Sequence, residues 1–336
     1  MLSFLPVNQS FNFIEVNATD EVFRAQENRF VNQSKFWNFY NAQNVRINNF
    51  GFRNDNDYSK SEKNIIAVIG DSYVEAVQVP FEKTFFNILD ESLRGEYKVY
   101  SFGFSGAPLS QYIKWAEYAI KNFNVKYLVF NIVGNDFDES MHNWKHSPGF
   151  HYFKKCENEK YCLFQESLKK NDLHFLKKSN IFSYLVYNLE LLNFMDNLKY
   201  SFKSIFNKND NIKYFGNVPY KVSKERMNDS RLAIRLFFKY LNEFDIPKSN
   251  IISIVDGRFY SNKKNYEDSF FSQIRESFFK QSKINNYSYI DLSKIFENDF
   301  QKTNRRFEFP KDSHWNELGH LIVGKTLIDY YNKIIK

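Results

Sequence analysis

The sequence predicts an α/β protein with a central parallel sheet of five strands and helices on both faces of that sheet. Short apolar runs rich in β-branched residues alternate along the chain with longer stretches of helical periodicity. The first such run, 65–69, contains no polar residue, as is typical of a strand that is covered on both faces. Strands that alternate with helices favour parallel pairing, and helices on both faces make three layers.

The predicted elements follow one another from residue 65 onward. The first strand is expected at 65–69, and the others are expected at 97–102, 127–133, 250–255 and 287–291. Helices are expected at 81–94, 109–122, 222–244, 265–281 and 315–333, with a loop at 303–313.

Two regions fall outside this alternation. Residues 1–60 are polar, rich in Asn and aromatic residues, and without a sustained period, which predicts an irregular N-terminal arm lying over an α/β domain at 61–336. Residues 137–220 predict a largely helical insertion near the carboxyl edge of the sheet, with a polar loop and an aromatic helical stretch at 180–205. A chain of 336 residues is long enough for one large domain or two smaller ones.

Composition limits the classes of partner. The formal net charge is +7, but the lysines are scattered, which favours a solvated basic surface. No nucleic-acid-binding motif accompanies this charge, so we expect no nucleic-acid partner. The chain has 38 Phe and 22 Tyr but only 11 Gly, so several glycines are expected where the backbone geometry requires them.

The two cysteines, Cys156 and Cys162, have five residues between them in a polar segment. They lack the spacing and the second ligand pair of a zinc site, and we expect neither a metal nor a cofactor. A disulfide between them would indicate an oxidising compartment. Two thiols in a cytosolic loop are the alternative.

Gly70-Asp71-Ser72 directly follows the first predicted strand. Ligands of parallel α/β sheets bind beyond the carboxyl ends of the strands, where Ser72 is expected to lie. A serine becomes a nucleophile only when a base removes its proton, so a histidine and an acid are required elsewhere in the chain. An ordinary turn would also use glycine and aspartate.

Two further motifs follow the second and third predicted strands. Phe102-Gly103-Phe104-Ser105-Gly106 has glycines that let a backbone N–H approach a ligand, or that simply form a tight turn before a helix. In Gly134-Asn135-Asp136, the Asn135 amide can donate to a developing oxyanion, although an Asx turn would equally explain this residue.

The loop before the final helix contains Asp312-Ser313-His314. Residues two apart in an extended segment face the same side, so Asp312 can orient His314 and stabilise its protonated form. Helix capping would explain Asp312 or Ser313 but not the histidine. The remaining histidines fall in the insertion or the final helix and are better explained as structural or surface residues: His142, His146, His151, His174 and His320.

Serine, glycine, asparagine and histidine thus occur in this order, each after a predicted strand or in the final loop, where one pocket can gather them. In this respect the chain from about residue 64 resembles the SGNH/GDSL hydrolase superfamily, whose sequence blocks contain these four residues. The resemblance implies a three-layer, flavodoxin-like SGNH-hydrolase fold with a five-stranded parallel sheet.

The resemblance also implies a role for each matching residue. Ser72 is the implied nucleophile, and its backbone N–H is one donor of the oxyanion hole. The Gly106 backbone N–H and the Asn135 side chain are the other implied donors. His314 is the implied base and Asp312 the implied acid of a catalytic triad. The implied activity is that of a serine esterase or O-acyltransferase that forms an acyl-enzyme on Ser72.

Two departures from the family pattern bear on the substrate. Ser101 stands where an asparagine often opens the second block, and Asp312 precedes His314 by two residues rather than three. The second departure is similar to members resembling bacterial polysaccharide acetylation proteins, in which Asp-x-His-Trp is common. It indicates acetyl or other short acyl esters of a carbohydrate, on a small molecule or a polysaccharide.

The start of the chain bears on its location. The segments Asn48–Arg53 and Leu2–Pro6 resemble stretches of membrane-anchored bacterial relatives, so we expect an extracytoplasmic chain with a membrane anchor upstream of it. The sequence itself has no signal peptide and no run of the roughly 18 apolar residues that a membrane span needs.

The acyl acceptor is left open by the sequence. Water as the acceptor would make the protein an esterase, and a sugar hydroxyl would make it an O-acyltransferase. An alternative from another class is a non-catalytic carbohydrate-binding protein that retains the SGNH fold without turnover.

Overall fold

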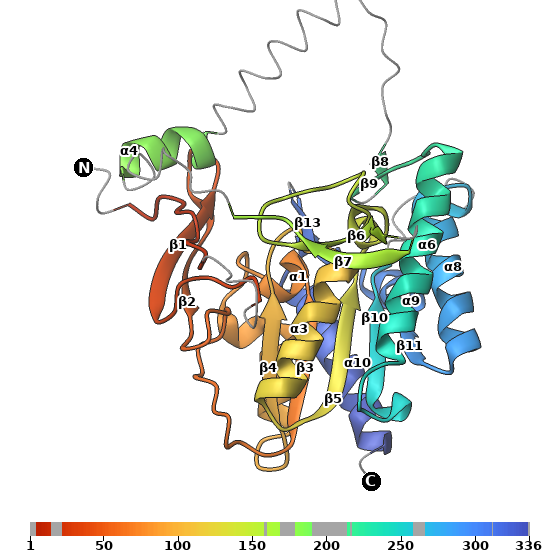
Figure 1. Cartoon of the computed structure of the whole chain (residues 1–336). Coiled ribbons are helices and arrows are strands. Elements are labelled where there is room, and N and C mark those ends of the chain that lie inside the picture. Colours follow the sequence, from red (N-terminus) through yellow and green to blue (C-terminus); the bar gives the residue numbers. More distant parts are fainter. Residues whose placement is uncertain are drawn as a thin grey trace, which may run out of the picture.

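A parallel sheet of five strands organises the chain (Figure 1). Each hydrogen-bonded pair of strands within this sheet is parallel. The strands lie in the order β4–β3–β5–β10–β11, with the bounds β3 Ile65–Gly70, β4 Lys98–Gly103, β5 Val125–Ile132, β10 Ile251–Val255 and β11 Ser288–Asp291. The computed structural model describes residues 5–14, 22–157, 160–168, 179–189, 214–215, 217–257, 266–310 and 312–334.

Side chains of the central strand alternate between two hydrophobic cores. Ile65, Ala67 and Ile69 belong to one core, whereas Ile66 and Val68 belong to the other. Successive side chains of a strand point to opposite faces, so an uninterrupted apolar run supplies both cores at once. This explains why the run at 65–69 shows no polar alternation.

Helices cover both faces of the sheet. One core contains residues of α3 (Leu109–Asn122), α6 (Lys224–Leu241) and α8 (Phe270–Asn285). The other core contains residues of α2 (Phe85–Ser92), α9 (Leu292–Thr303) and α10 (Glu317–Ile334). The predicted three-layer α/β class with a five-stranded parallel sheet is therefore confirmed.

The strand order indicates at which edge of the sheet a ligand would bind, and we call this the functional edge. Numbered along the chain, the five strands lie in the order 2-1-3-4-5, which is the flavodoxin-like arrangement. The direction of winding reverses between β3 and β5, and ligands of such sheets bind beyond the carboxyl ends of the strands at this switch point. Shorter elements at or near this edge are α1 (Ser72–Glu75), β12 (Glu308–Phe309), β13 (Asp312–Trp315) and the 3-10 turns Phe81–Lys83, Gly134–Asp136 and Asp138–Ser140.

The N-terminal arm contains regular structure, contrary to the irregular arm expected from the sequence. Strands β1 (Arg29–Lys35) and β2 (Tyr40–Ile47) form an antiparallel ribbon (Figure 1). A β-bulge between Gln33 and Lys35 shifts the register. Val31 and Ser34, three residues apart, are consequently both buried, so the sequence lacks the strict alternation that signals a strand.

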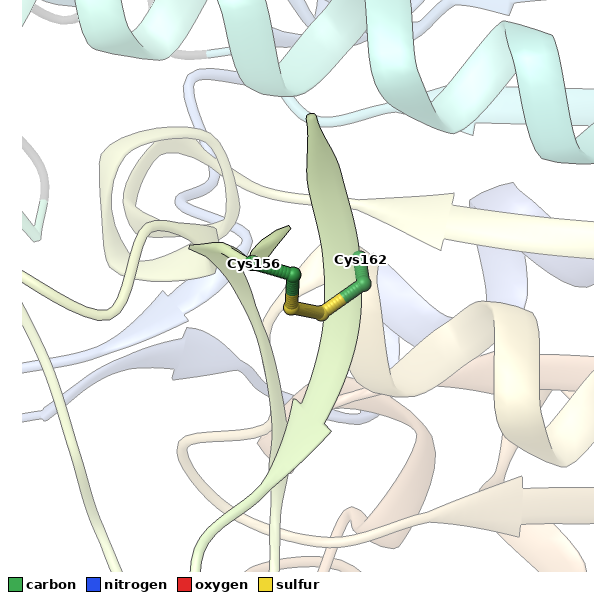
Figure 2. Close-up of a disulfide and its surroundings, with 2 residues drawn as sticks. All are labelled: Cys156 and Cys162. Carbon is green, nitrogen blue, oxygen red and sulfur yellow. A yellow bond between two sulfur atoms is a disulfide. The ribbon is translucent and has the colours of Figure 1, made fainter. Parts of the chain in front are cut away.

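The insertion begins with a second ribbon. Strands β6 (His151–Lys155) and β7 (Tyr161–Gln165) pair antiparallel where the sequence indicated a polar loop. Figure 2 shows that a disulfide joins Cys156 to Cys162 across this ribbon, which resolves the alternative that the sequence left open. The described remainder comprises α4 (Asn180–Ser183), a π-helical turn Tyr184–Asn188, β8 (Tyr214–Phe215) and β9 (Val218–Pro219). Of the helical stretch expected at 180–205, residues 190–205 lie outside the described part of the chain.

None of the helices in the described part of the chain combines the length and the apolar character that crossing a bilayer requires.

Candidate active site

Ser72 lies where β3 ends at the functional edge of the sheet. Asp71 caps α1 by accepting a hydrogen bond from the Tyr73 N–H at 3.0 Å, so Ser72 is the first residue of that short helix. The Ser72 hydroxyl donates to Asp71 Oδ2 at 3.2 Å, and 9% of the residue is exposed. A Cβ at Gly70 would come within 2.5 Å of Val74, so this tight strand-to-helix turn requires glycine.

Asp312 and His314 form a hydrogen-bonded pair on β13. Asp312 Oδ1 and His314 Nδ1 are 2.5 Å apart, and the same oxygen accepts the His314 backbone N–H at 3.2 Å. The predicted same-side placement of these two residues is what an extended segment produces. Trp315, the next residue, is buried and donates to Asp256 Oδ1 at 3.0 Å, which anchors the strand to the domain.

Tyr73 links the serine turn to the histidine strand. Its hydroxyl donates to the Ser313 carbonyl oxygen at 2.8 Å, and its ring lies against the His314 ring with 5.0 Å between centroids. The residues on either side of these contacts, Ser72 and His314, therefore lie at the same edge of the sheet.

Gly106 and Asn135 are joined by a second network. Lys145 Nζ donates to the Gly106 carbonyl at 3.0 Å and pairs with Glu139. Glu139 in turn accepts from Asn135 Nδ2 at 3.0 Å. Asn217 donates to Asn135 Oδ1, which fixes the orientation of the Asn135 amide. The amide nitrogen of Asn135 has two N–H groups, and the bond to Glu139 uses one of them.

The Gly106 loop is attached to α1 through a buried carboxylate. Glu75 accepts from both the backbone N–H of Ser105, at 2.9 Å, and its hydroxyl. Gly106 itself has a φ of +79°, a conformation that favours glycine. The α1 helix thus contacts both the loop after β4 and the strand that contains His314.

Burial dominates the electrostatics around α1. It raises the pKa of Asp71 to about 6, against the hydrogen bond from Tyr73, and raises the pKa of Glu75 to about 7. Asp312 behaves in the opposite way. Burial again disfavours its charge, but the hydrogen bonds and charges of His314 and Lys35 outweigh this effect and hold its pKa well below the usual range. Asp312 is therefore an ionised partner for His314 at neutral pH.

Arg53 binds the backbone at the C-terminal end of α1. Its buried guanidinium donates to the carbonyl oxygens of Glu75 at 2.7 Å, of Ala76, and of Val79 at 2.7 Å. Ser101 donates its hydroxyl to the Arg53 carbonyl at 2.8 Å. The segment before the first sheet strand thereby supports the turn that contains Ser72.

We expect Arg53→Met to lower the free energy of unfolding by about 3 kcal/mol or more, because three carbonyls would each lose the hydrogen bond from the buried guanidinium. Arg46→Met is the matched control, since Arg46 also donates to two carbonyls and a carboxylate, but in a more exposed position. The control should cost less than about 1 kcal/mol. Urea unfolding measures both changes, and equal losses in the two variants would contradict the support role of Arg53.

The competing histidines have structural surroundings. Burial lowers the pKa of His151 and of His320 to about 3, so both are neutral. His151 Nδ1 contacts Gln111, and His320 Nδ1 accepts from the Phe85 N–H at 3.3 Å inside the domain. His142 pairs with Glu166. The His142 and His146 rings lie 5.9 Å apart between centroids, whereas His174 lies outside the described residues.

Sequence reasoning missed the residues that surround the predicted ones. Lys35 contacts Asp312, and Glu139, Lys145 and Asn217 connect Gly106 with Asn135. No local motif marks these residues, because each acts through a contact with a distant part of the chain. Within the described residues no group of His, Cys, Asp and Glu side chains has a metal-site arrangement. A hollow of about 640 Å³ between α6 and α8 contains none of the predicted site residues, so we do not assign it to the site.

No protein-family model and no curated protein matches the sequence. Among solved structures, a lipolytic protein of the G-D-S-L family from Veillonella parvula is similar to this chain at 10% identity and a TM-score of 0.41, covering 80% of this chain and 98% of that one. A lipase/acylhydrolase from Enterococcus faecalis is similar at 11% identity and a TM-score of 0.42, covering 80% and 95%. A catalytic mutant of an acetylxylan esterase from Geobacillus stearothermophilus is similar at 12% identity and a TM-score of 0.44, covering 81% and 95%.

Proposed function

We propose that the protein is a serine-dependent acyl-ester enzyme that forms an acyl-enzyme on Ser72. The observation that supports this most strongly is the Asp312–His314 pair, hydrogen-bonded at 2.5 Å and linked through Tyr73 to the turn that contains Ser72. An ionised carboxylate bound to Nδ1 keeps the proton on that nitrogen and leaves Nε2 as the base.

In the proposed reaction, His314 Nε2 takes the Ser72 proton as Oγ attacks the ester carbonyl. The Ser72 hydroxyl donates to Asp71 in the structure, so the proposed reaction requires it to rotate about its Cα–Cβ bond toward the base. Catalytic hydrogen bonds of this kind often tighten only when the substrate binds. His314 then returns the proton to the leaving alcohol, and the acyl group remains on Ser72.

The tetrahedral oxyanion would be stabilised by the backbone N–H groups of Ser72 and Gly106 and by the Asn135 side chain. The fixed Asn135 amide supports this assignment, because Glu139 and Asn217 hold it in one orientation before the reaction begins. Preorganised donors of this type are the largest contribution in many acyl-transfer enzymes.

We further propose that the substrate is an acetyl or other short acyl ester of a carbohydrate. The support for this is the Asp312-Ser313-His314-Trp315 sequence, which resembles the Asp-x-His-Trp of polysaccharide acetylation proteins. Transfer of the acyl group to water would make the protein an esterase, and transfer to a sugar hydroxyl an O-acyltransferase.

The decisive experiment traps the acyl-enzyme. The full chain is mixed with p-nitrophenyl acetate or acetylated oligosaccharides, quenched in acid, digested and examined by mass spectrometry. We expect acetyl on the Ser72 peptide. A second sample, treated with a fluorophosphonate instead, should have its adduct at the same residue. The wild-type acyl-enzyme is then offered water alone or water with oligosaccharides, and the products identify the acceptor. If neither labelling nor turnover depends on Ser72, the non-catalytic carbohydrate-binding protein becomes the better description.

A further inference from the structure

The N-terminal ribbon places a lysine on the carboxylate of the proposed triad. Lys35, the last residue of β1, has its Nζ 2.5 Å from Asp312 Oδ2, while Asp312 Oδ1 contacts His314. The Asp312 side chain is only 4% exposed, whereas that of Lys35 is 36% exposed. Each oxygen of this buried carboxylate therefore has its own cationic or hydrogen-bonding partner.

The position of Lys35 is built into the ribbon. A β-bulge immediately precedes it, and bulges reorient the side chains that follow them. Asn188 contacts the residues on both sides of Lys35, because it donates to the side-chain hydroxyl of Ser34 at 2.9 Å and to the Phe36 carbonyl at 3.2 Å. The start of β2 also contacts the strand paired with β13, since the Tyr40 and Phe309 rings meet edge to face at 6.3 Å between centroids.

We propose, on the basis of the proposed function, that Lys35 is a positioning residue that orients Asp312 toward His314 and sets the pH at which His314 acts as a base. A carboxylate held at both oxygens cannot rotate away from the imidazole. The ammonium charge also offsets part of the carboxylate charge, which makes protonation of His314 less favourable than with Asp312 alone.

Lys35 acts on His314 through Asp312, and other groups lie near His314 as well. The groups around His314 are Asp312 on β13, Asp71 before α1, Glu75 and Tyr73 on α1, and His320 on α10. Burial keeps His320 neutral, and Asp71 and Glu75 have raised pKa values, so part of the acidic response belongs to these carboxyls. A direct titration of His314 separates its own response from theirs.

The test compares Lys35→Met and Lys35→Arg with wild type in two measurements, the pH profile of kcat/KM and the titration of the His314 imidazole by NMR. Without the ammonium charge, the imidazolium becomes more stable. We therefore expect the acidic limb of the profile, and the transition followed by NMR, to move to higher pH by roughly half a unit to one unit in Lys35→Met. Lys35→Arg should titrate like wild type.

The matched control is Lys98→Met, because Lys98 is 41% exposed and pairs at 3.7 Å with Asp90, which is 6% exposed, away from His314. This variant should leave both measurements unchanged. The inference would be overturned if Lys35→Met gave the same NMR titration and the same pH profile as the wild type. If the wild-type protein shows no turnover that depends on Ser72, the proposed function is contradicted instead. The NMR titration would still test the role of Lys35 in that case.

Discussion

Ser72→Ala should lower kcat for p-nitrophenyl acetate hydrolysis by about 10⁵-fold to 10⁶-fold, because no acyl-enzyme can form without the hydroxyl. The residual rate would come from the oxyanion donors, which still stabilise attack by water. Steady-state spectrophotometric assays at saturating substrate give kcat. The initial burst of p-nitrophenol, which reports acyl-enzyme formation, should disappear in this variant.

The fold should tolerate this change, since the Ser72 hydroxyl bonds only to its neighbour Asp71 among the hydrogen bonds described for it. A matched control is Ser253→Ala, which removes another buried hydroxyl from the same sheet, on β10. An unchanged thermal midpoint in Ser72→Ala, with full activity in Ser253→Ala, would attribute the loss to chemistry. An active Ser72→Ala enzyme would exclude Ser72 as the nucleophile.

Asp312→Asn should lower kcat by about 10⁴-fold while preserving the shape of the site. The carboxylate accepts the proton of His314 Nδ1, whereas an asparagine can present its amide N–H to that nitrogen. The imidazole would then hold its proton on Nε2, the nitrogen that must accept the Ser72 proton. Lys35 would favour this orientation, because it draws the remaining amide oxygen toward its ammonium group.

Asp90→Asn is the control for this prediction, since Asp90 is also a buried carboxylate that pairs with a partly exposed lysine. It should alter stability rather than kcat. NMR of the imidazole nitrogens distinguishes the two tautomers of His314 directly. Wild-type kcat in Asp312→Asn would show that the acid of the proposed triad is not needed.

The sheet could be predicted from sequence because each strand is a local apolar run that must be covered on both faces. The helix at 109–122 was predicted with the bounds that the structure has. Helix α9 was not predicted, since no loop separates it from β11: Asp291 ends the strand and also caps the helix by accepting from the Ser293 N–H at 2.8 Å. The N-terminal ribbon was missed because its bulge breaks the alternation of buried residues.

The candidate site divides along the same physical line. The structure places Ser72, Gly106 and Asn135 shortly after the ends of β3, β4 and β5, which the sequence predicts. His314 lies on the short strand β13 instead of the predicted loop, but it still immediately precedes the final helix. Lys35 and Asn217 could not be predicted in this way, because their partners are distant in sequence: 277 residues separate Lys35 from Asp312, and 82 separate Asn217 from Asn135. A single sequence contains no local pattern that reports such contacts.

The hydrogen bond from Tyr73 to Ser313 spans 240 residues and has a consequence for the order in which the protein acquires activity. During synthesis, the serine turn leaves the ribosome long before the segment that contains Asp312 and His314. A nascent chain therefore holds its nucleophile without a base. Under the proposed mechanism, the protein has no activity until β13 has docked beside α1, so chains that lack β13 cannot consume acyl donors.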